Sequence, residues 1–329
     1  MDGIASTASP EVALLLATYN GEKFVEEQLN SLQQNATRFV IHWLDDQSTD
    51  STPQLVRATA AKLGFPVREW HFEERLGVPG AFFKLIECVS ADIYLFCDQD
   101  DIWQPGKIDA SVADLTPDIA RPVLCFTDPF TFSQDVPERL RRVSEISKLK
   151  GPVAWRRSSM FVICPAMGHT IGFTRALREV FLKSKDVART HAAMHDAWLY
   201  LLATASGTSR LLTDAPTTLY RVHGRNVTGI YFAHLDWRGI WHFVRRWRLQ
   251  QSIRRWISRQ ARGFCLAAET FPAGPQFERT LHLARIIAKL DQRQSLRTLL
   301  HLIRMGAMPQ SKQFTLLFTA ACLYSDAKP

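Results

Sequence analysis

The sequence predicts an α/β fold in which helices flank a mostly parallel central sheet, with a helical extension toward the C-terminal end. Two observations support this prediction. Short apolar segments alternate with segments of helical periodicity from residue 11 to residue 101. The chain of 329 residues is also 46% hydrophobic and 22% charged, which is enough for one large core or two smaller ones and excludes wholesale disorder.

The first two strand–helix units lie within residues 11–64. The apolar run EVALLLATYN at 11–20 predicts a strand, and apolar residues at helical spacing follow it, namely Phe24, Val25, Leu29 and Leu32. RFVIHWLDD at 38–46 predicts a second strand. The segment TPQLVRATAAKLG then predicts a helix over 52–64, which opens at Ser and Thr residues and ends at Gly64.

A third unit runs from the strand VREWHF at 67–72 to the helix AFFKLIECVS at 81–90, with a Gly-Val-Pro-Gly turn predicted between them at 77–80. IYLFCDQDD at 93–101 then predicts a buried strand that leads directly into three carboxylates. Because strands and helices alternate throughout, we expect a parallel sheet with helices on both faces.

Polar side chains gather where the predicted strands end: Thr18, Tyr19, Asn20, Asp45, Asp46, Asp98, Asp100 and Asp101. Ligands of such sheets bind beyond these carboxyl ends. Neighbouring carboxylates raise one another's pKa unless a cation lies among them, and oxygen ligands favour Mg²⁺ or Mn²⁺. Alternatively, strand-end aspartates only cap helices and solvate turns. That reading suits Asp50 better than Asp98 and Asp100, because Gln99 between those two would place both on one side of an extended segment.

Five segments together carry a resemblance to a known family: LATYNGEKFVEEQLNSL, WLDDQSTDST, FCDQDDIWQPGKI, MHDAWLYLLATASG and LYRVHGRNVTG. In this order, over residues 11–230, they resemble the inverting glycosyltransferases of family two, and among these the rhamnosyltransferase-like bacterial enzymes of surface polysaccharide synthesis. An isolated Asp-x-Asp is a weak signal, whereas five ordered motifs are specific. The resemblance implies a GT-A fold, which is a Rossmann-like α/β sheet.

The resemblance also implies a donor site for a nucleoside diphosphate sugar. Asp45 would accept a hydrogen bond from the imide N–H of uracil or thymine, with Thr18 and Tyr19 lining the base pocket. The donor-binding residues that it implies are Thr18, Tyr19, Asn20, Asp45, Arg75, Asp98, Gln99, Asp101, His195 and Trp198. Asp98, Asp100 and His223 would hold Mg²⁺ or Mn²⁺ against the diphosphate, and Asp101 could join the metal shell, contact the sugar or cap the next turn.

Asp196 in the segment MHDAW is the catalytic base that the resemblance implies. An inverting transferase needs one carboxylate on the acceptor side, within hydrogen-bond reach of the attacking hydroxyl. Asp196 could also cap the following helix, and both roles are compatible. His195 and Trp198 would shape the acceptor or sugar pocket, although Trp198 could equally belong to the core.

Two further segments complete the expected site. Arg221, His223 and Arg225 would share one side of an extended segment and face the diphosphate, with the two arginines as solvated surface charges in the alternative reading. GHTIGFTRAL from Gly168 resembles the strand that backs the donor sugar in relatives, but has Thr174 where those more often have Asn. ERLGVPGAFFKL at 74–85 takes the place of a diphosphate-side loop.

The charge is divided unevenly along the chain. The net charge is +8, yet residues 232–329 alone carry 16 Lys and Arg against 5 Asp and Glu. We therefore expect a GT-A catalytic domain at 1–231, with nucleotide-sugar binding over about 11–130 and the acceptor side over about 150–231. Residues 232–329 would form a basic amphipathic helical extension.

The extension begins with a segment rich in Trp and Arg. LDWRGIWHFVRRWRLQQSIRRWISRQARGF holds four tryptophans and eight arginines among apolar residues, which suits a helix at an anionic membrane surface. Nucleic acid is the competing partner, but the RNA-binding signatures are missing, so we expect none. The remaining alternative is a helical appendage that packs its tryptophans on the catalytic domain.

The N-terminal residues show no signal-peptide pattern and no stretch is long and apolar enough for a span, so we expect a cytoplasmic protein, peripheral at the inner face of the plasma membrane. Six scattered cysteines indicate reduced thiols.

The expected function is metal-dependent, inverting transfer of rhamnose or another hexose from a UDP- or dTDP-sugar to a lipid-linked saccharide acceptor. The alternatives are a metal-dependent nucleotidyltransferase and a non-catalytic module that binds sugar nucleotides.

Overall fold

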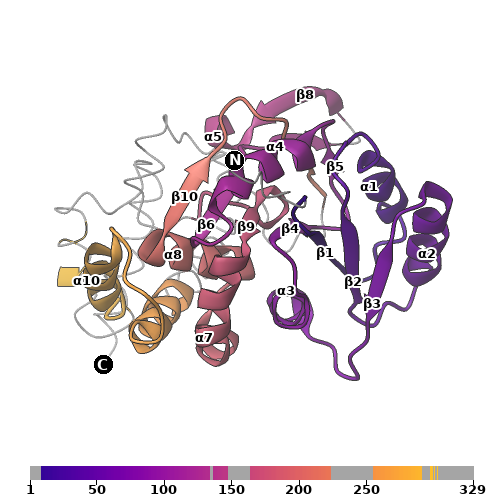
Figure 1. Cartoon of the computed structure of the whole chain (residues 1–329). Coiled ribbons are helices and arrows are strands. Elements are labelled where there is room, and N and C mark those ends of the chain that lie inside the picture. The colour runs from indigo at the N-terminus through magenta and orange to yellow at the C-terminus, as the bar shows by residue number, and fades with distance from the viewer. Residues whose placement is uncertain are drawn as a thin grey trace, which may run out of the picture.

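The computed structural model describes residues 9–133, 136–146, 164–223 and 255–290, together with 297, 298, 300 and 302. Its centre is a seven-stranded sheet of order β10-β6-β9-β4-β1-β2-β3 (Figure 1). The strands are β1 Val12–Thr18, β2 Val40–Asp45, β3 Val67–Trp70, β4 Ile93–Cys97, β6 Val123–Phe126, β9 Gly172–Thr174 and β10 Thr208–Leu211. All neighbouring pairs are parallel except the two that β9 makes. The predicted mostly parallel sheet is confirmed.

A second, four-stranded sheet has the order β5-β11-β7-β8. Its strands are β5 Ile102–Trp103, β7 Phe130–Ser133, β8 Val136–Arg142 and β11 Thr218–Arg221. β11 pairs with β5, which directly follows the aspartates at 98–101. This pairing brings the residues around 221, far along the chain, to the end of β4.

The helices alternate with the strands as predicted. They are α1 Val25–Ser31, α2 Thr52–Leu63, α3 Gly77–Cys88, α4 Lys107–Leu115, α5 Val143–Ile146, α7 Arg175–His191, α8 His195–Ser206 and α10 Phe277–Ile287, with a further helical stretch at 255–267. α2 ends at Gly64, which has the left-handed φ of 70°. In Figure 1, α1 and α2 lie together at one end of the molecule, and α10 lies beside α8 at the other.

The turn predicted at 77–80 is wrong. These residues form the first turn of α3, because the carboxylate of Asp46 accepts hydrogen bonds from the backbone N–H groups of Leu76 and Gly77 at 2.6 and 2.8 Å. An acceptor at a helix N-terminus satisfies donors that have no partner within the helix. That acceptor lies about 30 residues earlier in the chain, so local turn propensity could not reveal it.

Two apolar cores cover the two faces of the central sheet. Alternate residues of β1 point to opposite sides, since Ala13 and Leu15 lie in one core and Leu14 and Leu16 in the other. The first core also contains residues of α3, α7 and α8, whereas the second contains residues of α1, α2 and α4. The sheet edge at the ends of β1, β2 and β4 is therefore held rigidly from both sides.

Part of the predicted C-terminal extension belongs to the first core. Ile257, Phe264, Phe271 and Leu281 are buried in it with side chains of α7 and α8. The predicted boundary at 231/232, and all but the end of the Trp- and Arg-rich segment, lie outside the described residues. Trp256, which is described, remains 43% exposed.

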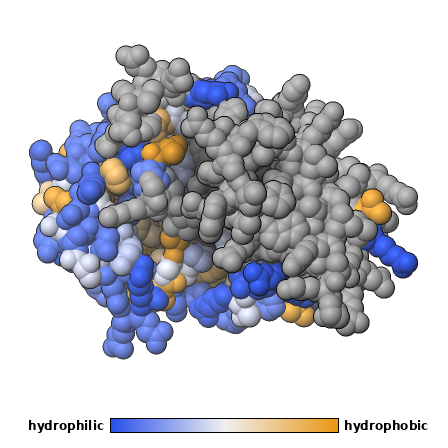
Figure 2. Space-filling model, turned by 180° about the vertical axis from the view of Figure 1, so that it is seen from behind, coloured by the Kyte–Doolittle hydropathy of each residue, from blue (hydrophilic) through white to orange (hydrophobic). Residues whose placement is uncertain are grey.

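The described surface seen in Figure 2 is mostly hydrophilic, with separate apolar spots. Among the residues with a described exposure, the large exposed apolar side chains are Val222, Trp256, Leu266 and Leu300. No helix within the described ranges is long and apolar enough to cross a membrane.

Candidate active site

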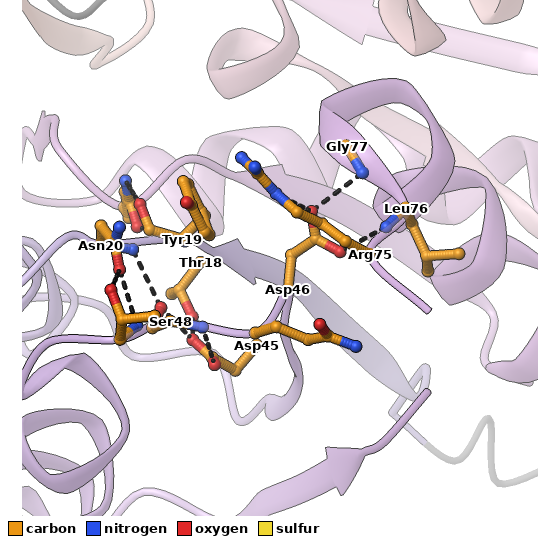
Figure 3. Close-up of polar contacts among 12 residues, drawn as sticks. Thr18, Tyr19, Asn20, Asp45, Asp46, Ser48, Arg75, Leu76 and Gly77 are labelled. Carbon is orange, nitrogen blue, oxygen red and sulfur yellow. Dashed lines mark hydrogen bonds and ion pairs between the residues drawn. The ribbon is translucent and has the colours of Figure 1, made fainter. Parts of the chain in front are cut away.

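Thr18 and Asp45 lie side by side because β1 and β2 pair in register up to this point. The Thr18 hydroxyl donates to Asp45 Oδ1 at 2.7 Å, and Trp43 Nε1 donates to the Thr18 hydroxyl at 2.9 Å. Ser48 donates to the same carboxylate from its backbone N–H and its hydroxyl. Figure 3 shows this cluster at the end of the two strands. The carboxylate is therefore held in one orientation by three neighbouring donors.

Gln99 holds the backbone of Tyr19. Its Oε1 accepts from the Tyr19 N–H at 2.9 Å, and its Nε2 donates to the Tyr19 carbonyl at 3.0 Å. A Cβ at position 21 would lie 2.2 Å from Gln99 Oε1, so a larger residue there would displace the Gln99 amide from Tyr19. The polar group of Gln99, a predicted donor-binding residue, is thus engaged with the loop that carries Tyr19.

Asn20 connects the loops that follow β1 and β2. Its backbone N–H donates to the Ser48 hydroxyl at 2.9 Å, and its side-chain oxygen accepts from the Thr49 N–H at 2.8 Å (Figure 3). Asn20 has a φ of +47°, a conformation that Asn tolerates better than most residues. The Asp50 carboxylate accepts hydrogen bonds from Thr52 and from the Glu22 N–H. This agrees with the alternative prediction that Asp50 only caps a helix and stabilises a turn.

Arg75 and Asp46 lie beside Tyr19. The Arg75 guanidinium stacks over the Tyr19 ring at 3.6 Å and lies 3.8 Å from the Asp46 carboxylate, while its side chain stays 54% exposed. Figure 3 shows Arg75 between these two side chains. Arg75 therefore offers a positive charge at the rim, next to the ring predicted to line the base pocket. Asp46, which also fixes the start of α3, was not among the predicted site residues.

Asp98 and Asp100 follow β4 in a turn, so the prediction of an extended segment is wrong. The two carboxylates nevertheless influence each other. Burial raises the pKa of Asp98 to about 8, with further contributions from the negative charges of Asp100 and Asp196. Three predicted site carboxylates from two distant segments therefore lie near one another.

His223 reaches Asp100, as the metal prediction requires. Its Nε2 lies 2.9 Å from Asp100 Oδ2, and its ring stacks on Phe24 at 5.0 Å. Arg221 does not share a solvent-facing side with it. That arginine is buried, donates from Nε to the Asp100 carbonyl at 2.8 Å and pairs with Glu27. Arg225 lies outside the described residues.

Asp101 points into the protein. Its Oδ1 accepts from the Arg221 N–H at 3.0 Å, and its Oδ2 lies 3.4 Å from His169 Nδ1. Its side chain is fully buried, and burial together with the nearby carboxylates of Asp100 and Asp98 raises its pKa well above the usual range. These contacts give Asp101 a structural role that was not among the three expected ones, because they tie β11 to the aspartate loop.

Asp196 occupies the first turn of α8. Its Oδ2 accepts from the Gly168 N–H at 3.1 Å and its Oδ1 from the Ala197 N–H at 2.6 Å. α8 begins at His195 with Met194 in the N-cap position, so Asp196 is not the N-cap residue. Burial raises the pKa of Asp196 to about 6, against the lowering effect of these hydrogen bonds. A carboxyl group with this pKa can accept a proton near neutral pH.

His195 and Trp198 are buried beneath this turn. The His195 ring stacks on Phe82 at 4.1 Å, and burial lowers its pKa to about 3, so it is neutral. A Cβ at Gly168 would lie 2.8 Å from His195 Nε2, which explains glycine there. Trp198 is fully buried in the first core and donates to the Ser184 hydroxyl at 3.3 Å. The core alternative for Trp198 agrees with this placement.

Thr174 accounts for the departure from the family pattern in the segment that begins at Gly168. Its hydroxyl accepts from the Leu177 N–H as the N-cap of α7, and donates to the Arg121 carbonyl at 2.6 Å. The residue thus serves the start of a helix.

The residues predicted to hold a metal have suitable chemistry. Asp98 and Asp100 offer carboxylate oxygens, whose mutual repulsion a divalent cation would relieve, and His223 adds a nitrogen next to Asp100. Within the described parts of the chain, no group of three or more His, Cys, Asp or Glu side chains is already arranged as a metal site. The oxygen and nitrogen atoms of these three side chains are therefore suitable ligands for Mg²⁺ or Mn²⁺.

The mostly parallel sheet, with polar side chains after β1 and carboxylates at the ends of β2 and β4, has the GT-A fold of known glycosyltransferase structures. A mannosyltransferase from Pyrobaculum calidifontis, solved with GDP-Man and Mn²⁺, matches it with a TM-score of 0.57 at 19% identity, covering 98% of this chain and 87% of that one. The S. aureus TarS 1-349 fragment in complex with UDP-GlcNAc matches with a TM-score of 0.51 at 18% identity, covering 97% and 92%.

The family follows from the sequence comparison. The model of glycosyl transferase family 2 matches residues 14–183, so the chain belongs to that family. A curated relative, the dTDP-rhamnosyl transferase RfbG of Shigella flexneri, is 27% identical over 225 residues, which cover 65% of this chain and 73% of the relative. The resemblance to family-two, rhamnosyltransferase-like enzymes is confirmed.

Proposed function

We propose that this protein is a metal-dependent, inverting glycosyltransferase that uses a UDP- or dTDP-sugar. It transfers rhamnose or another hexose to a saccharide acceptor in the synthesis of a surface polysaccharide such as an O-antigen. The observation that carries the proposal is the proximity of Asp98, Asp100 and Asp196, which come from two segments distant in the sequence. Family membership argues against the nucleotidyltransferase alternative. The similarity to RfbG, a dTDP-rhamnosyl transferase, supports dTDP-rhamnose as one candidate donor.

Different residues of the site would bind the base and the diphosphate of the donor. Asp45, supported by Thr18 and Ser48, offers an acceptor for the imide N–H of uracil or thymine. Asp98 and Asp100, with His223, would hold the divalent cation, which supplies positive charge where the departing diphosphate becomes more negative. Arg75, whose side chain is 54% exposed, stacks on the Tyr19 ring at the end of β1 and would offer a positive charge to the donor.

Asp196 takes the proton of the attacking acceptor hydroxyl in this proposal. Its carboxylate is anchored by the N–H groups of Gly168 and Ala197, so it is oriented before the acceptor binds. Because attack and departure occur on opposite faces of the sugar, one step inverts the anomeric carbon. A single base suffices, since the leaving diphosphate needs no proton when its charge is neutralised.

A thermal-shift screen of sugar nucleotides with Mn²⁺ tests the donor assignment. UDP- and dTDP-sugars are expected to raise the melting temperature, because ligands that bind only the folded state stabilise it. Asp45→Asn should weaken this shift, since the amide holds fewer acceptor sites than the carboxylate. Asp186→Asn, at an exposed carboxylate of α7, is the matched control and should leave the shift unchanged. A larger shift with GDP-sugars than with UDP- and dTDP-sugars would contradict the assignment of Asp45.

We further propose that the basic segment before the helix at 255–267, residues 232–254, binds the inner face of the plasma membrane, where a lipid-linked acceptor resides. Its five arginines and three tryptophans suit an anionic interface. In flotation assays the full-length protein should rise with vesicles that contain anionic lipid, but not with neutral vesicles. Replacing Arg245, Arg246 and Arg248 by serine should reduce the floated fraction. Equal flotation with both kinds of vesicle would contradict the electrostatic part of this proposal.

A further inference from the structure

The helix at 255–267 contacts the connection that leads into the proposed base. Gln260 Oε1 accepts from the Ala193 N–H at 3.0 Å, and Arg259 Nη2 donates to the Ala192 carbonyl at 3.3 Å. One turn further along, a Cβ at Gly263 would lie 2.3 Å from His191 Cβ. Three consecutive residues, 191–193, are therefore held by one face of a helix about 65 residues later in the chain.

The connection between α7 and α8, residues 192–194, is short and lies just before Asp196. α7 ends at His191 and α8 begins at His195, so only three residues lie between the two helices. Ala193 lies three residues before Asp196, so any shift of Ala193 is transmitted to the first turn of α8. The contact of Asp196 with the Gly168 N–H, at 3.1 Å, leaves little room for such a shift.

The helix at 255–267 is itself fixed by the first apolar core. Ile257, Ala261 and Phe264 of this helix are buried in the first core, and the Ser258 hydroxyl donates to the Ala288 carbonyl at 2.9 Å. The Gln260 side chain is only 2% exposed, and its hydrogen bond to Ala193 is partly buried. Losing this acceptor would leave the Ala193 N–H without its partner in a partly buried place, and the connection would move to satisfy it.

We propose that Gln260 is a positioning residue for the reaction: its hydrogen bond to Ala193 fixes the start of α8 and thereby places Asp196 against the acceptor hydroxyl. The C-terminal extension thus takes part in the acceptor side of the site, beyond any role at a membrane. The inference rests on the proposed function, because it assumes that Asp196 is the base. It predicts an effect on the chemical step with little effect on donor binding, since the donor residues lie at the ends of β1, β2 and β4.

The test compares two variants at Gln260 with one control variant. Gln260→Met removes the acceptor at similar volume and should lower kcat about tenfold, because small misplacements of catalytic groups are costly, with the KM for the donor changed less than about twofold. Gln260→Glu keeps an acceptor oxygen and should recover most of the lost kcat. The control is Gln276→Met, at an exposed glutamine of the same extension, and it should match the wild type.

A folded Gln260→Met protein with wild-type kcat would overturn the inference, and so would a loss that appears equally in kcat and in donor affinity. If that variant does not fold, Arg259→Gln decides the matter, because Arg259 is exposed. That variant should lower kcat about threefold, and wild-type kcat there would also overturn the inference. Failure of the proposed function is distinguishable: Asp196→Asn would then retain transfer, whatever Gln260→Met does.

Discussion

Asp196→Asn is expected to lower kcat about a thousandfold, because the amide cannot accept the proton of the attacking hydroxyl. The substitution is nearly isosteric and keeps an oxygen that can accept from the Gly168 N–H. Donor binding should therefore persist, and the loss should appear in kcat while the KM for the donor changes little. Steady-state kinetics, together with titration of the donor nucleotide into the variant, measures both quantities.

The same assignment predicts a pH dependence of the wild type. Burial raises the pKa of Asp196 to about 6, and only the ionised carboxylate can take a proton. At saturating Mn²⁺, the rate should therefore fall as the pH drops through about 6 and level off above it. Asp186→Asn, at an exposed aspartate of α7, is the matched control and should leave rate and profile unchanged. Near-normal transfer by Asp196→Asn with an intact donor site would disprove the base assignment.

Removing divalent metal with EDTA is expected to lower transfer by at least about a hundredfold, since the charge of the leaving diphosphate would lose its main stabilisation. Mg²⁺ or Mn²⁺ should restore the activity. Asp100→Asn should weaken the response to Mn²⁺, because it removes one carboxylate charge next to His223. Measuring the rate over a series of Mn²⁺ concentrations for both proteins tests the assignment.

The affinity for Mn²⁺ should itself depend on pH. Burial and the neighbouring carboxylates raise the pKa of Asp98 to about 8 in the metal-free protein, so a proton competes with the metal below that pH. Binding should therefore weaken as the pH falls from 8 to 6. Full activity in EDTA, or an unchanged Mn²⁺ response in Asp100→Asn, would rule out the metal role of this residue.

The strand-end carboxylates could be found from sequence because each is a local pattern. An apolar run followed by polar residues marks the end of a parallel strand, and such ends meet at one edge of the sheet. Asp45 and Asp98 were identified in this way, and the register of β1 with β2 places Thr18 beside Asp45 as that reasoning requires. The role of Asp196 was different, because only the family resemblance singled it out.

Contacts between segments that are distant in the chain could not be predicted from the sequence. Asp46 determines where α3 begins, which local Gly and Pro signals placed several residues later. Arg221 was expected to face the diphosphate or to be a solvated surface charge, yet it is buried and pairs with Glu27, 194 residues earlier in the chain. Trp198 and His195 follow the family motif, but whether a motif residue faces a pocket or the core depends on what packs against it.

By itself, the sequence determined the fold class, the family and most residues at the carboxyl ends of the strands, because these follow from local periodicity and ordered motifs. Only the tertiary structure decided the orientation of individual side chains: Gln99 toward the Tyr19 backbone, Asp101 toward Arg221, and Gln260 toward the connection before Asp196. These contacts join residues that lie 67 to 120 positions apart. Partners so far apart meet only after the sheet and its two cores have formed, and no local pattern records them.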